Sequence, residues 1–264
     1  MTMIRDWSGF IGGRRALISG AGAGIGRAIA IQMARAGAMV WVNDRFLDRA
    51  ESVVDEIEAE GSAAKPVVGD VTEIDSVREM LRVTGPVDIL VNNAGTGVRA
   101  FREGIIQLAP FVETAPDDWD PVMRVNLYGV LHMTHAYLPG MLEQRWGRVL
   151  TIISDAGRRG ERGQVVYGAA KAAAAGFTRG LAQEVGRSGI TVNCISLGTI
   201  RHADMARALD ADPEREAALT RPYPMGRLGR VEDPAPLAVL LCSDAAEWIT
   251  GQVYPVDGGY APSP

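Results

Sequence analysis

The chain contains little that would cross-link it or anchor it in a membrane. Only two cysteines occur in 264 residues, Cys194 and Cys242, and both sit in apolar runs. Neither a disulfide framework nor a CxxC metal site is therefore expected, and both thiols are predicted to be reduced and buried. No run reaches the roughly 18 consecutive apolar residues that would suggest a membrane span.

The chain also has no excess of positive charge and few aromatic residues. There are 27 Lys and Arg against 32 Asp and Glu, a net charge of −5, and 6% of residues are aromatic. Such a chain lacks the basic patch with interleaved aromatics that binds nucleic acid, and it matches an anionic membrane poorly. The first 15 residues lack the apolar segment of a secretory signal. We therefore expect a cytoplasmic protein with no nucleic-acid partner, no membrane contact and no bound metal.

Short apolar runs alternate with longer amphipathic segments along the chain. Segments such as 24–37 and 46–61 carry apolar residues at helical spacing. The alternation predicts an α/β fold, a single domain over 1–264 with helices on both faces of a parallel sheet. Ligands of such sheets bind outside the carboxyl ends of the strands, where strand order reverses. The apolar runs, which read as strands covered on both faces, span 14–20, 38–44, 63–71, 87–95, 147–154, 190–198 and 251–259.

A glycine-rich turn follows the first run and opens the first helical segment. Gly20, Gly24 and Gly26 let the backbone approach a pyrophosphate, and the helix N-terminus stabilises its charge. Asp44 ends the second run about 20 residues later, where a carboxylate accepts bonds from an adenosine ribose and repels a 2′-phosphate. This favours NAD over NADP, although Arg45 could hold the extra phosphate. Asp70 could border the adenine or simply cap the next helix.

Ser154 ends the fifth run, and Tyr167 and Lys171 follow at helical i, i+4 spacing, which places them on one face. An ammonium near a phenol favours the phenolate, so we expect a lowered Tyr167 pKa and a general acid/base. Lys171 is one of only two lysines in an arginine-rich chain, which favours a compact ammonium at that position. Asn126 could hold a water in a proton path or be an ordinary helix residue.

Taken in order, these motifs resemble the short-chain dehydrogenase/reductase family over about residues 9–260. The resemblance implies a Rossmann-type, doubly wound parallel sheet of seven strands that carries a nicotinamide cofactor. It also implies hydride transfer between an alcohol and a carbonyl, and a homotetramer or dimer. The matching segments are SGAGAGIG (19–26), GDV (69–71), NNAG (92–95), RVN (124–126), YGAAK (167–171), ITVNCIS (190–196) and ITGQVYPVDGG (249–259).

The resemblance also implies roles for individual residues. Tyr167 would be the proton donor and acceptor, and Lys171 would lower its pKa and bind the nicotinamide ribose. Ser154 would orient the substrate carbonyl, and Asn126 would complete the proton relay. With Arg45, the expected cofactor contacts are Gly20, Gly24, Ile25, Gly26, Asp44, Asp70, Val71, Asn92, Ala94, Gly95, Tyr167, Lys171, Gly198 and Ile200.

The chain departs from the family pattern near the expected substrate. Leu197 and Gly198 replace a common Pro-Gly pair, and His202 stands where a threonine is common. Ile153 precedes Ser154 in place of serine or glycine, which should make that wall drier. Residues 96–110 look like an insertion at the mouth of the site, and long loops there are more often functional than idle.

The substrate is the least determined feature. The segment 154–171 resembles family members that act on hydroxyacyl-CoA thioesters, so a CoA-linked secondary alcohol or ketone is the first hypothesis. The alternatives are a free sugar, a steroid or a cyclic alcohol, or a catalytically silent binding subunit. A set of basic residues near the mouth could bind a carboxylate or phosphates, or could form a solvated rim: Arg99, Arg102, Arg158, Arg159, Arg162, Arg201 and His202.

Overall fold

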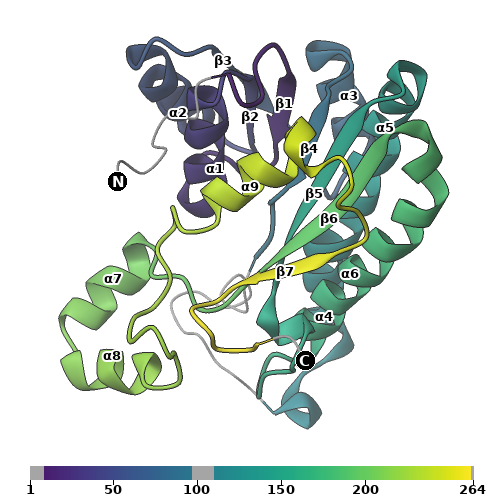
Figure 1. The fold of residues 1–264 in the computed structure, drawn as a ribbon. Coiled ribbons are helices and arrows are strands. Elements are labelled where there is room, and N and C mark those ends of the chain that lie inside the picture. Colours follow the sequence, from purple (N-terminus) through teal and green to yellow (C-terminus); the bar gives the residue numbers. More distant parts are fainter. Residues whose placement is uncertain (1–8, 97–109, 263–264) are drawn as a thin grey trace.

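The computed structural model describes residues 9–96 and 110–262, in which seven strands form one parallel sheet (Figure 1). Its strand order is β3-β2-β1-β4-β5-β6-β7, and every neighbouring pair is parallel. Each of the seven apolar runs contains one strand. The strands are β1 (Arg15–Ile18), β2 (Met39–Asp44), β3 (Ala64–Val68), β4 (Ile89–Asn92), β5 (Gly147–Ser154), β6 (Ile190–Leu197) and β7 (Val253–Val256).

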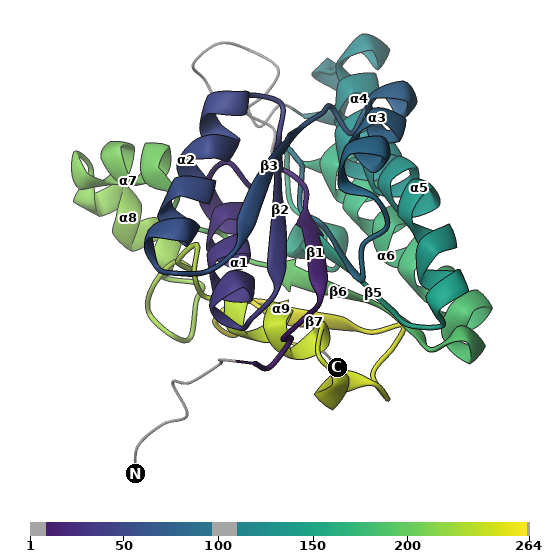
Figure 2. The same ribbon diagram turned by 90° about the horizontal axis from the view of Figure 1, so that it is seen from above.

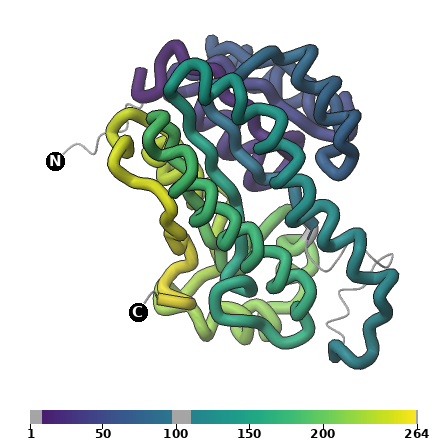
Figure 3. Tube along the Cα trace, turned by 90° about the vertical axis from the view of Figure 1, so that its right-hand side faces the viewer, coloured from purple at the N-terminus to yellow at the C-terminus, as the bar shows by residue number. Residues whose placement is uncertain are grey.

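Burial along the strands follows their place in the sheet. The central strand β4 is buried at all four residues, and β6 at all eight, as a strand covered on both faces requires. The edge strands differ from this expectation: β3 exposes Lys65 and Val68, and β7 is half-buried throughout. Figure 3 shows the C-terminal segment that contains β7 running along one edge of the molecule.

Helices cover both faces of the sheet (Figure 2). One face packs against α1, α2 and α9 through residues such as Ile29, Val53 and Val239. The other packs against α3, α5 and α6, with Met80 and Tyr137 in its core. The helices of the described residues are α1 (Gly24–Arg35), α2 (Leu47–Ala59), α3 (Ile74–Thr84), α4 (Pro116–Met123), α5 (Gly129–Gln144), α6 (Val165–Val185), α7 (Ala203–Asp210), α8 (Pro213–Thr220) and α9 (Ala235–Leu241).

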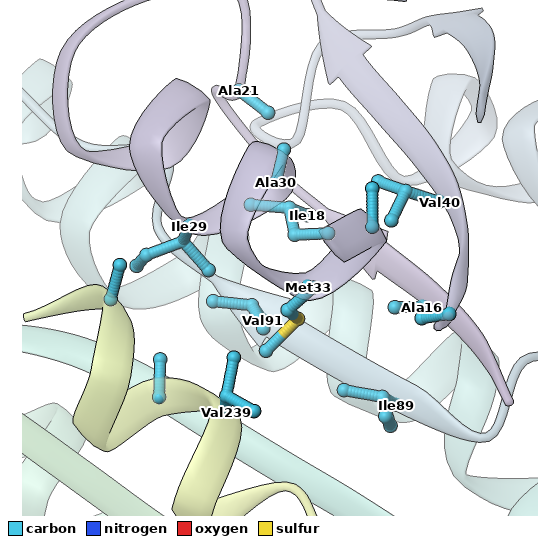
Figure 4. Packing of buried hydrophobic residues seen from close by; sticks show 14 of the residues in the cluster. Ala16, Ile18, Ala21, Ile29, Ala30, Met33, Val40, Ile89, Val91 and Val239 are labelled. Atoms are coloured by element: carbon cyan, nitrogen blue, oxygen red, sulfur yellow. The ribbon is translucent and has the colours of Figure 1, made fainter. Parts of the chain in front are cut away.

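The packing of α1 fixes the turn that precedes it. Ile29 and Met33 are fully buried between the sheet and α9, where Figure 4 shows them near Val91 and Val239. Burying side chains of this size stabilises the fold by roughly 1.5–3 kcal/mol each. Because α1 is anchored along its length, its N-terminus is held rigidly over the carboxyl end of β1.

The two halves of the sheet diverge between β1 and β4, which are neighbours although β2 and β3 intervene in the chain. The predicted doubly wound α/β sheet is thereby confirmed, and its topological switch point lies at the carboxyl ends of these two strands. Helices α7 and α8 lie outside the two layers, beyond the end of β6 (Figure 1). Among the described residues, no helix is both long and apolar enough to cross a membrane.

Candidate active site

A cleft of about 650 Å³ lies at the switch point, as the sequence predicted for the ligand. Residues that follow β1, β2, β3 and β4 all contribute to it. Of the predicted cofactor contacts, its lining includes Gly20, Ile25, Asp44, Arg45, Asp70, Val71, Ala94 and Gly95. Cavities of this size hold drug-sized ligands and cofactors.

The glycine turn is shaped for a close backbone approach. Gly20 and Gly24 have φ angles of +62° and +57°, which side-chain-bearing residues rarely adopt. A Cβ at Gly26 would collide with the carbonyl oxygen of Gly20 and the amide of Asn93. The turn therefore leaves backbone at the surface of the cleft, next to the N-terminus of α1, as a pyrophosphate site requires.

The far end of the cleft carries two carboxylates, Asp44 and Asp70, and two arginines, Arg45 and Arg49. Asp44 reaches back over the turn, since its Oδ2 would be 2.6 Å from a Cβ at Gly22, while its Oδ1 accepts the backbone N–H of Phe46. Arg45 is 3.6 Å from Asp70 Oδ2. Arg49, which the sequence reasoning missed, lies over the Phe46 ring and lines the cleft. The signal was available, because Arg49 lies in the first turns of the helix predicted after Asp44.

The two asparagines at the end of β4 have different surroundings: Asn92 packs toward α5, and Asn93 lines the cleft. Asn92 is 3% exposed and donates to Thr134 Oγ1 on α5, so its side chain turns away from the cleft. Asn93 lines the cleft and donates its amide to the backbone oxygens of Ser19 and Gly20. Asn93 thus ties β4 to the glycine turn, and the expected cofactor contact Asn92 is not part of the cleft's lining.

Ser154, Tyr167 and Lys171 converge where β5 meets α6. Ser154 ends β5 and its Oγ both accepts the N–H of Ala156 and pairs with the Tyr167 phenol. Lys171 lies with its Nζ 5.8 Å from the centre of the Tyr167 ring, on the same face of α6. The predicted juxtaposition of phenol and ammonium is therefore present.

Two glycines bring the serine turn this close to α6. A Cβ at Gly157 would lie 2.8 Å from the backbone nitrogen of Ala172, and one at Gly168 would lie 2.7 Å from the carbonyl oxygen of Ala156. Distances this short exclude any larger side chain without a shift of backbone. The approach that sets Ser154 against Tyr167 therefore depends on small residues on both sides.

Burial dominates the ionisation of this cluster and overturns one expectation. It raises the pKa of Tyr167 above its ordinary value; the Ser154 hydrogen bond opposes this, and the negative charge of Glu161 adds a smaller increase. Burial also lowers the pKa of Lys171 to about 8. The expected lowering of the Tyr167 pKa is therefore wrong for the protein alone, because burial of the phenol dominates, while the Lys171 ammonium donates to the carbonyl of Ile152 at 2.9 Å.

Asn126 joins this cluster to the cleft. It lies in a π-helical turn, Arg124–Tyr128, between α4 and α5, and is fully buried. A Cβ at Gly95 would lie 2.8 Å from Asn126 Oδ1 and 3.3 Å from Lys171 Nζ, so both polar groups border the Gly95 backbone. Asn126 Oδ1 has no hydrogen-bond partner among the described residues. An orphaned buried acceptor beside an ammonium fits a bound water or ligand hydroxyl.

The loop after β6 forms a second hollow of about 220 Å³, which is lined by Gly198, Thr199 and Ile200 together with Tyr223 and Asp257. The expected cofactor contacts Gly198 and Ile200 therefore lie just beyond the carboxyl end of β6, which pairs with β5. His202 does not enter the hollow's lining; its Nδ1 accepts the N–H of Met205 and caps α7.

Most of the described arginines expected at the mouth are held by protein groups. Arg158 pairs with Asp155, and Arg201 pairs with Asp210 and Glu216. Arg159 lies over the ring of Tyr260 and donates to its carbonyl oxygen. Arg99, Arg102 and most of the expected insertion, 97–109, lie outside the described residues.

The two cysteines are buried and unpaired, as predicted. Burial raises the pKa of Cys194 to about 11 and that of Cys242 to about 12, so neither thiol ionises near neutral pH. Cys194 also lies within hydrogen-bonding distance of Thr178 Oγ1, at 3.1 Å. Both behave as small core side chains.

A glycine turn at the switch point of a parallel sheet, with a Ser-Tyr-Lys cluster beside it, defines a nucleotide-dependent oxidoreductase site. A family model described as enoyl-(acyl carrier protein) reductase matches residues 20–261. The chain belongs to the short-chain dehydrogenase/reductase family, whose members are NAD(P)-binding oxidoreductases.

Particular relatives narrow the comparison. The chain is 39% identical over 251 residues to the 3-oxoacyl-[acyl-carrier-protein] reductase of Pseudomonas aeruginosa. The matched region covers 94% of this chain and 97% of that protein. A 3-oxoacyl-[acyl-carrier protein] reductase from Brucella melitensis with bound NAD superposes with a TM-score of 0.89 at 33% identity, over 99% and 97% of the two chains. A gluconate 5-dehydrogenase from Burkholderia cenocepacia with NADP and tartrate gives 0.85 at 34%, over 98% of each.

Proposed function

We propose that this protein interconverts a 3-oxoacyl thioester and its 3-hydroxy form, using NAD(H) in preference to NADP(H). The observation that carries the proposal is the convergence of Ser154, Tyr167 and Lys171 beside the Gly95 edge of the cleft. The nicotinamide cofactor, when bound, supplies or accepts the hydride.

The cleft fits that cofactor by its glycine turn and by Asp44. Gly20, Gly24, Ile25 and Gly26 would hold the pyrophosphate, and Asp44 would accept bonds from the adenosine ribose. Asp70, Val71 and Ala94 would border the adenosine, and Gly198 and Ile200 the nicotinamide. Asn92 would act indirectly, through its bond to Thr134.

We propose NAD because the charged group nearest the glycine turn is the Asp44 carboxylate and not a cation. A 2′-phosphate would bring negative charge against Asp44, while Arg45 lies 3.6 Å from Asp70 and is partly neutralised by it. Arg49 is the cation best placed to oppose this preference, since it lies beside Asp44 at the same end.

Tyr167 would pass a proton to or from the substrate oxygen. Its raised pKa keeps the phenol protonated at neutral pH, which suits a proton donor during reduction of a carbonyl. Ser154 would hold the substrate oxygen with its hydroxyl, and Lys171 would bind the nicotinamide ribose. Asn126 would hold the water that returns the proton.

The electrostatics near Tyr167 favour a substrate whose reacting end is neutral. The Glu161 carboxylate acts on the phenol, and Arg158, Arg159 and Arg201 are engaged by protein groups. A free keto acid such as acetoacetate or 5-ketogluconate carries its carboxylate on the same short chain as the reacting carbon and would bring that negative charge into the site with Glu161. A 3-oxoacyl thioester is neutral there, and its charged carrier lies many bonds away.

A comparison of carbonyl substrates tests this proposal. We expect acetoacetyl-CoA with NADH to give a kcat/KM at least tenfold above that of free acetoacetate or 5-ketogluconate, followed by NADH absorbance. A higher value for the keto acid would replace the thioester by a sugar acid. Tight NADH binding without turnover of any carbonyl in a wider panel, including steroids and cyclic ketones, would instead indicate a silent binding subunit.

A further inference from the structure

A buried charge cluster lies directly behind the Ser154 turn. Asp155 is fully buried, and its Oδ1 accepts both Ser196 Oγ at 2.6 Å and Arg158 Nη1 at 2.8 Å. The same Arg158 nitrogen lies 3.7 Å from Asp257 Oδ2, in the loop after β7. The side chains of Arg158 and Asp257 are only 17% and 6% exposed, so the cluster is largely dry.

Two carboxyl groups lie around one guanidinium nitrogen. Arg158 Nη1 lies 2.8 Å from Asp155 Oδ1 and 3.7 Å from Asp257 Oδ2, and Asp155 Oδ2 has no hydrogen-bond donor among the described residues. Two carboxylates this close to one another cannot both ionise cheaply in a dry site, and one guanidinium compensates only one of them. A single shared proton satisfies Oδ2 and leaves the three side chains neutral overall.

Asp257 continues the connection into the loop after β6. Its two oxygens accept the N–H groups of Gly259 and Ala261, each at 2.9 Å, and so set the turn that carries Tyr260. Tyr260 stacks on Tyr223 with 4.7 Å between ring centres. The Tyr223 hydroxyl in turn accepts the N–H of Thr199 at 2.8 Å.

We propose that Asp155 and Asp257 share one proton, and that this carboxyl pair, clamped by Arg158, holds Ser154 and the loop Gly198–Ile200 in register across the substrate end of the site. Asp155 is a positioning residue here, since it acts through Ser154 and through Asp257. The proposal rests on the proposed function for the roles of Ser154 and of that loop.

Burial and the neighbouring carboxylate favour the protonated form of Asp155, as the proposed pairing requires. Burial raises the pKa of Asp155, and Asp257 raises it further, against hydrogen bonds from Ser196 and Arg158. Glu161 is a second negative group within range of Asp155, and its own charge is partly offset by Arg159. Tyr260 also interacts electrostatically with Asp155. None of these groups donates a hydrogen bond to Asp155 Oδ2, so they leave the need for a shared proton unchanged.

Two substitutions at one position separate the shared proton from simple packing. Asp155→Asn keeps the shape and donates an N–H to Asp257 as a protonated carboxyl would, so we expect kcat/KM within about threefold of the unsubstituted protein. Asp155→Ala removes the partner of both Ser196 and Arg158, and we expect kcat/KM to fall at least tenfold. Asp75→Asn, on an 88% exposed side chain, is the matched control. Equal losses from the Asn and Ala variants would overturn the proposal.

A pH series tests the proton without relying on turnover. A raised folded-state pKa stabilises the native protein below the ordinary carboxyl range, and this stabilisation falls as pH rises toward the folded-state pKa. The Asp155→Asn variant lacks that loss, so its Tm should rise relative to the unsubstituted protein as pH increases above about 4. A Tm difference that stays constant across the series would show that no proton is shared.

Hydrogen exchange at the Thr199 amide tests the positioning directly. We expect protection to fall at least tenfold in Asp155→Ala and to be retained in Asp155→Asn and Asp75→Asn. Unchanged protection in Asp155→Ala would show that Asp155 does not hold the loop. If the protein reduced no carbonyl at all, the proposed function would fail, while the exchange and Tm series would still decide this inference.

Discussion

At the scale of single residues, the site contains a buried lysine that destabilises the folded protein. Lys171 is 5% exposed, has no carboxylate partner among the described residues and donates to a backbone carbonyl. Burial lowers its pKa to about 8, which means that holding the charged form near neutral pH costs the native state about 3 kcal/mol. A cost of this kind is typical of residues kept for function.

Lys171→Met should therefore stabilise the protein while abolishing turnover. Between the folded pKa of about 8 and the ordinary 10.5, the unfolded chain binds more protons, so the lysine destabilises the native state fully below pH 8 and progressively less above it. At pH 7 we expect a gain of about 1–3 kcal/mol in unfolding free energy, measured by denaturant titration. The gain should shrink as pH approaches 10.5, and a gain independent of pH would contradict this account.

Asp44 should decide between the two cofactors. Removing its charge in Asp44→Ala takes away the repulsion of a 2′-phosphate and leaves Arg45 and Arg49 at that end of the cleft. We expect the ratio of kcat/KM for NAD over NADP to fall about 10- to 100-fold, equivalent to about 1.4–2.8 kcal/mol. Asp48→Ala, in the first turn of α2, is the matched control and should leave the ratio unchanged.

An Asp44→Ala ratio equal to that of the unsubstituted protein would remove Asp44 from cofactor selection. A preference for NADP in the unsubstituted protein would show that Arg45 or Arg49 outweighs the carboxylate.

At the scale of elements, the junction of β1 and α1 depends on backbone that is not covered by side chains. A Cβ at Gly26 would meet the Gly20 carbonyl and the Asn93 amide, neither of which can move without disturbing the turn. Gly26→Ala should weaken NADH binding at least tenfold, measured by fluorescence titration, and lower Tm. Gly176→Ala in α6 meets nothing within 4 Å and should leave binding unchanged and raise stability by about 0.4–1 kcal/mol. Equal binding by both variants would contradict a close approach at this turn.

The elements were predictable because their signals are local. Apolar runs bounded by glycine or aspartate located all seven strands, and i, i+4 spacing placed Tyr167 and Lys171 on one face of α6. The sequence did not show that Asn93, and not Asn92, faces the cleft. Which of two adjacent asparagines does so depends on the backbone conformation at the end of β4.

Tertiary environment accounts for the other differences. The raised Tyr167 pKa reflects burial by segments distant in the sequence, and no spacing rule reports the depth of a side chain. The partners of Arg158 include Asp257, 99 positions along the chain, so an arginine expected at the mouth of the site lies in a largely buried cluster instead. Gly157 and Gly168 were given no role of their own in the sequence analysis, although Gly168 lies in the YGAAK segment, and only the packed backbone shows why both are small.

At the scale of the whole molecule, the edge strand β7 has no second strand beside it among the described residues. Strand β7 is half-buried along its length and has β6 as its neighbour on one side, and Trp248 is 96% exposed in the segment that precedes it. Unpaired strand edges and exposed aromatics favour association. Light scattering after size exclusion should give the mass of two or four chains of 28.2 kDa, and a monomer at micromolar concentration would contradict this prediction.

The strands are parallel, so the carboxyl ends of β1, β4, β5 and β6 lie at one edge of the sheet, where the cleft, the Tyr167 cluster and the loop after β6 are found. The account's central claim is that proton transfer to the substrate passes through Tyr167. The most direct test is a single-turnover measurement of NADH oxidation by acetoacetyl-CoA in the unsubstituted protein and in Tyr167→Phe. We predict a rate lower by about 10²–10⁴-fold in Tyr167→Phe, with NADH affinity and Tm nearly unchanged. A single-turnover rate in the variant equal to that of the unsubstituted protein would contradict the claim.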